Sequence, residues 1–164
     1  MAEFVHRTFG VPAEQAGLAY MIVGVVGVAG SRLSPAIVGR LGQRGTVLFG
    51  ISAFSIAALA LPFSAAFAPA TAVLFTFWAF GTWTGLPAQQ TLIAGMNDRI
   101  RGTVLAFNSS ALNLGGVVGP IVTGQVLLAG GFEAAMPWSA LLGVCAFLLA
   151  WRVLPRTPAG TGAA

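Results

Sequence analysis

The sequence predicts an all-α, polytopic membrane protein with about five transmembrane helices. Its 164 residues are 57% hydrophobic and only 7% charged, whereas about a quarter of the residues of a soluble domain carry a charge. Its apolar segments reach the length of about 20 residues that a helix needs to cross the hydrocarbon core of a bilayer. Six of its eight arginines lie in alternate connections between these segments or at the end of the chain. These observations together indicate a helical bundle embedded in a membrane.

Five apolar segments support the predicted number of helices, at roughly residues 16–38, 46–66, 70–96, 102–129 and 134–154. They are apolar almost all round, whereas a helix on the surface of a soluble protein keeps a polar face. Their connections are short, so consecutive helices are expected to be antiparallel neighbours. We therefore predict a five-helix membrane domain over residues 16–154. A helix stub and outer loop precede it at residues 1–15, and a flexible cytoplasmic tail follows at residues 155–164.

The arginines also predict the orientation in the membrane. The connections after the first and third spans, together with the end of the chain, carry six arginines: Arg40, Arg44, Arg99, Arg101, Arg152 and Arg156. The other two connections carry none. Because loops rich in arginine stay on the cytoplasmic side, this face is predicted to be cytoplasmic. The expected localisation is the cell (inner) membrane, with several passes and a cytoplasmic carboxyl terminus.

The residue types present exclude several classes of function. The net charge of +4 is spread too thinly to form a basic patch for nucleic acid. Cys145 is the only cysteine and His6 the only histidine, so we expect no cluster of metal ligands. The spans offer no combination of serine, histidine and acid for catalysis. We therefore expect no enzyme and no metal or cofactor; the expected partners are the lipid bilayer and a small-molecule substrate.

Glycine and proline occur inside the fourth predicted span, at Gly115, Gly119, Pro120 and Gly124. Membrane helices tolerate these residues, because small side chains let helices approach closely and neighbours can satisfy a freed carbonyl group. Two interpretations are compatible with this pattern. The residues either pack a helix tightly against its neighbours or break a helix that lines a moving cavity.

Polar residues fall on defined faces of the third and fourth spans. Ser109, Asn113, Gly116 and Pro120 are spaced to share one face of the fourth span, with Asn108 on the adjoining stripe. A face of the third span carries Trp78, Thr82, Gly85 and Gln89, with Trp83 and Gln90 beside it. At about 1.5 Å per residue, Asn113 lies near the middle of the bilayer, where the sites of transporters are found.

These polar residues have two possible roles. The amides either form hydrogen bonds between helices or line a cavity for an amphipathic substrate, which the nearby tryptophans favour. In the second case we expect the first, third and fourth spans to line the cavity and the second and fifth to be peripheral. The candidate substrate contacts are Asn113, Asn108, Ser109, Gln89, Gln90, Trp83 and Trp78.

Arg32 is the only charged residue well inside a predicted span. It either extends towards the membrane surface or pairs with a loop, or it acts in gating or in contact with an anionic substrate. The four acids lie at or outside the ends of the spans. We therefore expect no proton-carrying side chain deep in this bundle.

Several motifs resemble those of the major facilitator superfamily. The run GRLGQRG at residues 39–45 is similar to its signature loop, which in the efflux branch commonly reads G-R-L-A-D-R-G, so that Gln43 stands in place of aspartate. The run GGVVGPIVTG at residues 115–124 resembles the glycine and proline pattern of the drug:proton antiporter branch. The runs PAQQ and RGTVLAFNSSALNLGG are similar to the tenth and eleventh spans of arabinose-efflux-like permeases.

The resemblance implies the carboxy-terminal half of a secondary transporter with twelve spans. Residues 1–10 would be the stub of its seventh span, the truncated sixth helix of this half-bundle, and the five predicted spans would be the eighth to twelfth. It also implies proton-coupled efflux of a small molecule, with a gating loop formed by Gly39, Arg40, Gln43 and Arg44. An amino-terminal half would be expected to carry an arginine near Phe77, which is absent, and the chain ends shortly after the fifth span.

Transporters of this kind work by rocking one half against another, so this chain is expected to be incomplete alone. It would be a truncated product, or it would pair with an amino-terminal half or with a second copy. A protein of a different class is the alternative: a small integral membrane subunit that transports nothing and packs against a partner complex.

Overall fold

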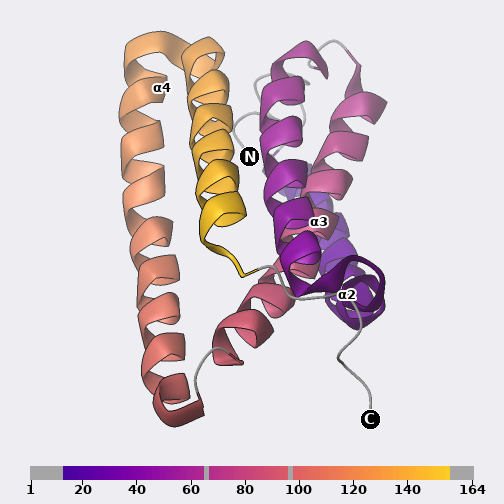
Figure 1. The fold of residues 1–164 in the computed structure, drawn as a ribbon. Helices are drawn as coiled ribbons and strands as arrows, with labels where there is room; N and C mark the ends of the chain where they lie inside the picture. The colour runs from indigo at the N-terminus through magenta and orange to yellow at the C-terminus, as the bar shows by residue number, and fades with distance from the viewer. Residues whose placement is uncertain (1–12, 65–66, 96–97, 156–164) are drawn as a thin grey trace.

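The computed structural model describes residues 13–64, 67–95 and 98–155. In these ranges the regular structure is entirely helical, which confirms the predicted all-α class. The elements are α2 (Ala13–Ser64), α3 (Ala68–Ala94), the short 3-10 helix η1 (Asp98–Ile100) and α4 (Arg101–Val153). Figure 1 shows them side by side in a bundle. Most of the predicted stub and tail, residues 1–12 and 156–164, lies outside the described residues.

Two of these elements are each made of two helical segments that meet at a glycine. Gly42 interrupts α2 with φ 72° and ψ 166°, and Gly131 interrupts α4 with φ 67° and ψ −168°. The described chain therefore contains the five helical segments that the sequence predicts. The connections at Gly42 and Gly131 are shorter than expected, because a single glycine with positive φ redirects the chain. Figure 1 shows α4 turning back on itself in this way.

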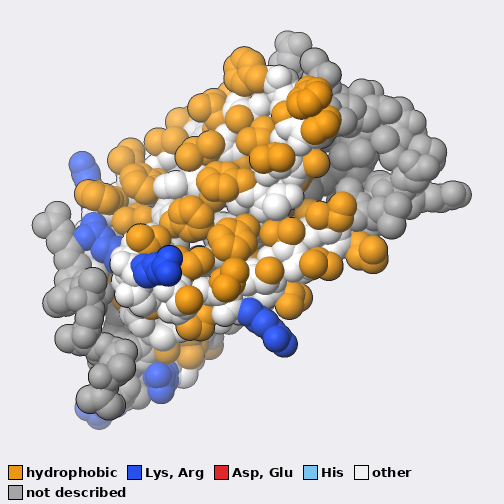
Figure 2. Space-filling view, turned by 90° about the vertical axis from the view of Figure 1, so that its right-hand side faces the viewer, with side chains coloured by type: hydrophobic (Ala, Val, Ile, Leu, Met, Phe, Trp, Pro, Cys, Tyr) orange, Lys and Arg blue, Asp and Glu red, His pale blue; other side chains and the backbone are white. Residues whose placement is uncertain are grey.

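Hydropathy and length identify two stretches of the described chain that can cross a membrane, Met21–Leu61 and Arg101–Gly131. The first includes Gly42, and Pro137–Val153 is a shorter apolar helix. Helix α3 carries threonines, glycines and two glutamines but no charged residue. The face in Figure 2 is mainly hydrophobic, with most arginine side chains towards one end.

A close contact between two backbones joins the second segment of α2 (43–64) to α3. A Cβ atom built on Gly50 would lie 2.8 Å from the carbonyl oxygen of Gly81 and 3.2 Å from the Cα of Gly85. Ala53, which is 0% exposed, packs directly on Gly81. Small residues permit this approach of one backbone to the other, and the resulting van der Waals contact holds membrane helices together.

The first segment of α2 (13–41) packs against α3 through small and hydroxyl residues. The Ser34 Oγ donates a hydrogen bond to the carbonyl oxygen of Thr84 at 2.8 Å. The Thr84 Oγ1 donates to the carbonyl oxygen of Gly30 at 3.4 Å. A Cβ atom on Gly30 would lie 3.0 Å from the carbonyl oxygen of Phe80. Both Ser34 and Thr84 are buried, so these bonds replace hydration that the interior of the bundle lacks.

The two segments of α4 differ in how far they are buried. The second segment (132–153) packs on α2, where a Cβ atom on Gly143 would overlap Ser55. In the first segment (101–130), every residue from 109 to 122 is exposed. These fourteen residues make almost four turns, so exposed residues occur all round this part of the helix within the described structure. Figure 1 shows the segment at the edge of the bundle.

Replacement of Gly42 by alanine is expected to destabilise the bundle by about 1 to 3 kcal/mol, because a side chain strains the backbone at positive φ. The loss would be measured as a shift in the denaturation midpoint in mixed detergent micelles. Gly39→Ala is the matched control: its Cβ atom would meet nothing within 4 Å, and alanine favours helix over glycine. Equal effects of the two changes would contradict the assigned role of Gly42.

Replacement of Gly50 by alanine is expected to cost about 1 to 3 kcal/mol, because the new methyl group forces α2 and α3 apart. The same denaturation assay measures this loss. Gly24→Ala provides the control, since a Cβ atom there would meet nothing within 4 Å. If Gly50→Ala leaves stability unchanged, the close contact at Gly81 does not hold the bundle together.

Candidate functional site

A groove of about 980 Å³ runs between α3 and the two segments of α4, and the second segment of α2 completes its walls. None of the residues that line it carries a charge. Most are apolar or glycine, and the polar exceptions are Thr82 and Gln89 of α3. The groove is thus a largely hydrophobic space with polar groups on one wall.

The wall formed by α3 is the polar face predicted from the sequence. Trp78, Thr82, Gly85 and Gln89 follow one another at helical spacing, and all four line the groove. The indole of Trp78 contacts Phe75 edge to face, with ring centroids 6.4 Å apart. This contact restricts the indole, and the ring presents a large apolar surface to the groove.

A hydrogen bond between two amides joins this wall to α4. The Gln89 Nε2 donates to the Asn108 Oδ1 at 3.2 Å. Both side chains are half-buried, and Gln89 itself lines the groove. In this pair one amide thus forms a hydrogen bond between helices and also lies in the wall of the groove.

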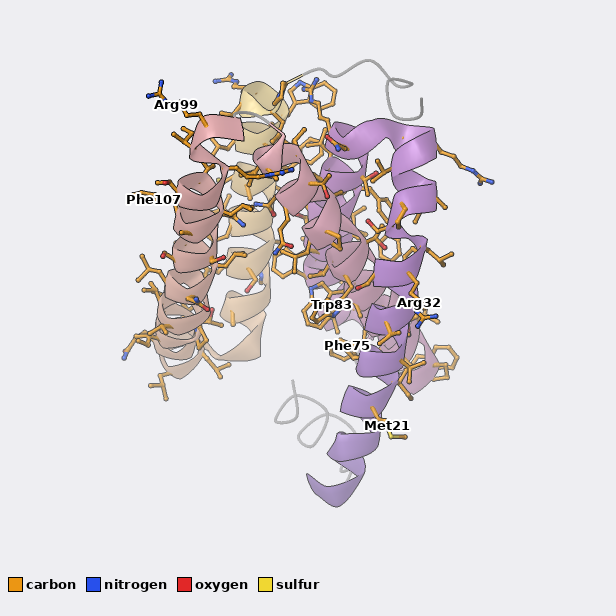
Figure 3. All side chains as sticks on the ribbon, turned by 90° about the horizontal axis from the view of Figure 1, so that it is seen from below. Met21, Arg32, Phe75, Trp83, Arg99 and Phe107 are labelled. Carbon is orange, nitrogen blue, oxygen red and sulfur yellow. The ribbon has the colours of Figure 1, made fainter. Side chains whose placement is uncertain are left out.

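The other candidates lie elsewhere. Ser109, Asn113 and Gln90 are exposed, and none of them is among the residues that line the groove. Trp83, 44% exposed, packs against the first segment of α2, where a Cβ atom on Gly27 would lie 2.8 Å from its Cδ1. Phe107 is 73% exposed and points away from the bundle in Figure 3. Of the candidates, the structure thus places Trp78 and Gln89 in the wall of the groove and joins Asn108 to Gln89.

The glycine and proline residues of α4 form an open surface. The helix continues through Pro120, and a Cβ atom on Gly115, Gly119 or Gly124 would meet nothing within 4 Å. Gly115 and Pro120 line the groove. Within the described structure these small residues therefore widen the space beside α3 and make no close helix contact.

Two spans that we expected to be peripheral also line the groove. The second segment of α2 contributes Val47, Gly50, Ile51 and Phe54, and the second segment of α4 contributes Leu142, Gly143 and Ala146. The first segment of α2, expected to line the cavity, supplies no lining residue. In the sequence, Gly50 and Gly143 could have indicated that these two spans pack against other helices, because a helix that only faces lipid has no need of glycine at a contact position.

The predicted gating loop lies where α2 bends. Gly39 and Arg40 are exposed, and Gln43 is half-buried. The Arg44 Nη2 donates to the carbonyl oxygen of Trp151, and its guanidinium carbon lies 4.9 Å from the centre of the Trp151 ring. The Arg44 Nε is buried without a hydrogen-bond partner. Arg44 thus joins the start of the second segment of α2 to the end of α4.

The bond between Gln89 and Asn108 is expected to couple α3 and α4. A double-mutant cycle of Gln89→Ala and Asn108→Ala should give an interaction free energy of about 0.6 kcal/mol, the average for such bonds between membrane helices. Stability in mixed micelles provides the measurement. The control cycle pairs Gln90→Ala with Asn108→Ala and should give no coupling, because Gln90 is exposed. Additive effects in both cycles would contradict the bond.

Comparisons with known proteins agree with the motifs of the sequence. The family model described as Major Facilitator Superfamily matches residues 1–164. The chain is 29% identical over 138 residues to the uncharacterized MFS-type transporter YwfA of Bacillus subtilis (strain 168), covering 82% of this chain and 32% of that protein. It is 29% identical over 159 residues to the multidrug resistance protein MdtG of Escherichia coli O9:H4 (strain HS), covering 93% and 38%. No solved structure matches the chain.

Proposed function

Since the chain belongs to the major facilitator superfamily, we propose that it forms one part of a secondary transporter and supplies one wall of its substrate path. The chain spans about a third of the length of the curated relatives it matches, 32% and 38%. The observation that carries the proposal is the groove of about 980 Å³ beside α3. Its volume lies at the upper end of the range of about 300 to 1,000 Å³ typical of ligand pockets.

The lining of the groove favours an uncharged or amphipathic small molecule. Trp78, Phe54 and Leu86 supply apolar surface, and Gln89 and Thr82 supply hydrogen-bonding groups. Few polar groups on an apolar wall orient a ligand without excluding related ones. The name of one relative, a multidrug resistance protein, is consistent with this substrate class and with efflux. Catalysis plays no part in this proposal.

Coupling to protons follows from the resemblance to antiporters, and we assign the proton-carrying group to the remainder of the transporter. The acids of this chain are Glu3, Glu14, Asp98 and Glu133, and all lie near the ends of the predicted spans. A group that takes up and releases a proton across the membrane must instead lie in the pathway.

The exposed part of α4 supports the need for a second half. Residues 109–122 are all exposed, and they include Ser109 and Asn113 beside three glycines. Lipid covers apolar side chains at little cost but offers no hydrogen bonds to amides in the core of the bilayer. We therefore place the amino-terminal half, or a second copy of this chain, against this segment.

The carboxyl terminus is proposed to face the cytoplasm. The contact of Arg44 with Trp151 brings the arginine-rich bend of α2 and the end of α4 to one end of the bundle. This arrangement gathers arginines at a single membrane surface, as the positive-inside rule requires. The protein is accordingly placed in the cell membrane as a multi-pass protein.

Substitutions in the groove are expected to reduce efflux by the complete transporter, in which this chain is joined by its amino-terminal half. Trp78→Ala and Gln89→Leu should each lower the efflux rate of a fluorescent amphipathic dye about tenfold or more, because each removes a contact with the substrate. Expression and membrane insertion, measured by immunoblot, should be unchanged.

Trp138→Ala and Gln90→Leu are the matched controls, because both residues are exposed and neither lines the groove. They should leave efflux within about twofold of the unmodified protein. Asn113→Ala tests the residue that the sequence places near the middle of the bilayer. If Asn113→Ala loses efflux while Trp78→Ala stays active, the substrate path lies outside the groove. Unchanged efflux in all three would favour a subunit without a transport role.

A further inference from the structure

Arg32 carries a charge deep in the first segment of α2. It precedes the bend at Gly42 by ten residues, or about 15 Å along the helix, which is half the thickness of a hydrocarbon core of about 30 Å. The side chain is exposed, and Figure 3 shows it on the opposite side of α2 from Trp83. A guanidinium at this depth is costly unless an opposite charge or water reaches it.

The described part of the chain supplies no anion to Arg32. No ion pair or hydrogen bond of its guanidinium occurs among the side chains that the structure describes. Glu14 lies 18 residues earlier in α2, about 27 Å along the helix. Asp98 lies in the connection between α3 and α4, Glu133 follows the bend of α4, and Glu3 lies outside the described residues. Lipid phosphates stay at the membrane surface, so the anion must come from another protein segment.

An apolar cleft of about 540 Å³ lies between the first segment of α2 and α3. Thr76 is the only lining residue with a polar side chain, and its Oγ1 donates to the carbonyl oxygen of Ala72 at 2.8 Å. Arg32 is not among the residues that line this cleft. The cleft therefore offers no partner to the guanidinium, and Arg32 belongs to the outer surface of α2.

The surface around Arg32 suits the approach of another helix. Ala29 and Ala36 lie three residues before it and four residues after it, spacings that make side chains neighbours on a helix surface. Both alanines are exposed, and the exposed residues Val25 and Val28 continue the same surface. These five residues are called the Arg32 face. Small residues let membrane helices approach closely, so the alanines leave room for a partner beside the guanidinium.

We propose that the Arg32 face binds a transmembrane helix of the remaining part of the transporter, and that this helix carries an aspartate or glutamate near the middle of the bilayer. The carboxylate accepts charge-assisted hydrogen bonds from the guanidinium, and each charge gives the other the partner that hydrocarbon lacks. A second copy of this chain does not fit this face, because it would bring a like charge and no acid within its predicted spans. The pairing rests on the proposed function, which supplies the second part of the transporter.

The charge is tested with the transporter expressed as two separate chains, this chain and a tagged amino-terminal half. The amount of this chain that copurifies in detergent is measured. Arg32→Asp should lower copurification about tenfold or more, because like charges then meet in the interface. Arg32→Lys keeps the charge and should stay within about threefold of the unmodified chain. Arg152→Asp is the matched control, since Arg152 is also exposed but lies at the end of α4; it should leave copurification unchanged.

The partner acid is identified by charge reversal. In the Arg32→Asp background, each aspartate and glutamate within the spans of the amino-terminal half is changed to arginine in turn. One of these changes should restore copurification about fivefold or more, because the pair is rebuilt with its charges exchanged. This rescue also shows that Arg32→Asp folds and inserts into the membrane.

The close approach is tested by the size of a neighbouring side chain. Ala36→Trp should lower copurification about fivefold, because the indole keeps the partner helix away from Arg32. Leu149→Trp is the control, since Leu149 is exposed on the second segment of α4; it should have no effect. Helix content from circular dichroism shows whether each variant folds, and Ala36→Leu replaces Ala36→Trp if it does not.

The proposal is overturned if Arg32→Asp copurifies as well as the unmodified chain, if no charge reversal restores association, or if the larger side chain at Ala36 has no effect. Intact copurification of Arg32→Asp, together with reduced efflux in Trp78→Ala, would overturn this pairing alone and leave the transport function in place. Failure of the unmodified chain to copurify with the amino-terminal half would contradict the proposed function and the pairing together.

Discussion

The close contact of Gly50 with Gly81 and Gly85 is the constraint on which the rest of the structure depends. In a bilayer the hydrophobic effect does not draw helices together, so a bundle depends on van der Waals contact between closely approaching backbones. At Gly50 even one methyl group would lie 2.8 Å from the backbone of α3. This contact fixes α3 against the second segment of α2, and the groove takes its shape from the position of α3.

Helix α3 is a wall shared by two different environments. One face presents Trp78 and Gln89 to the groove, and another presents Phe77 and Phe80 to the apolar cleft. Thr82 and Gln89 lie on the groove face, whereas Thr84 faces the first segment of α2 and donates to the carbonyl oxygen of Gly30.

Arg44 shows how a family motif changes when one residue differs. The signature loop usually has aspartate where this chain has Gln43, and the neighbouring arginine then finds other partners. Here Arg44 donates to the carbonyl oxygen of Trp151 and lies 4.9 Å from the centre of its ring. A cation over an indole face is attracted by the negative charge of the ring system. The bend of α2 and the end of α4 are therefore joined without an acid, and the Arg44 Nε stays buried without an acceptor.

The sequence by itself determined the helical class, the five segments and the face of α3 that carries Trp78, Thr82, Gly85 and Gln89, because hydropathy and helical spacing are properties of each segment alone. Only the tertiary structure decided which helices line the groove. Trp83 lies against Gly27, and Gly50 and Gly143 lie in the wall of the groove. Two of the predicted connections are single glycines with positive φ, Gly42 and Gly131. These features depend on how the surfaces of two helices fit together, and no single segment encodes the shape of its neighbour.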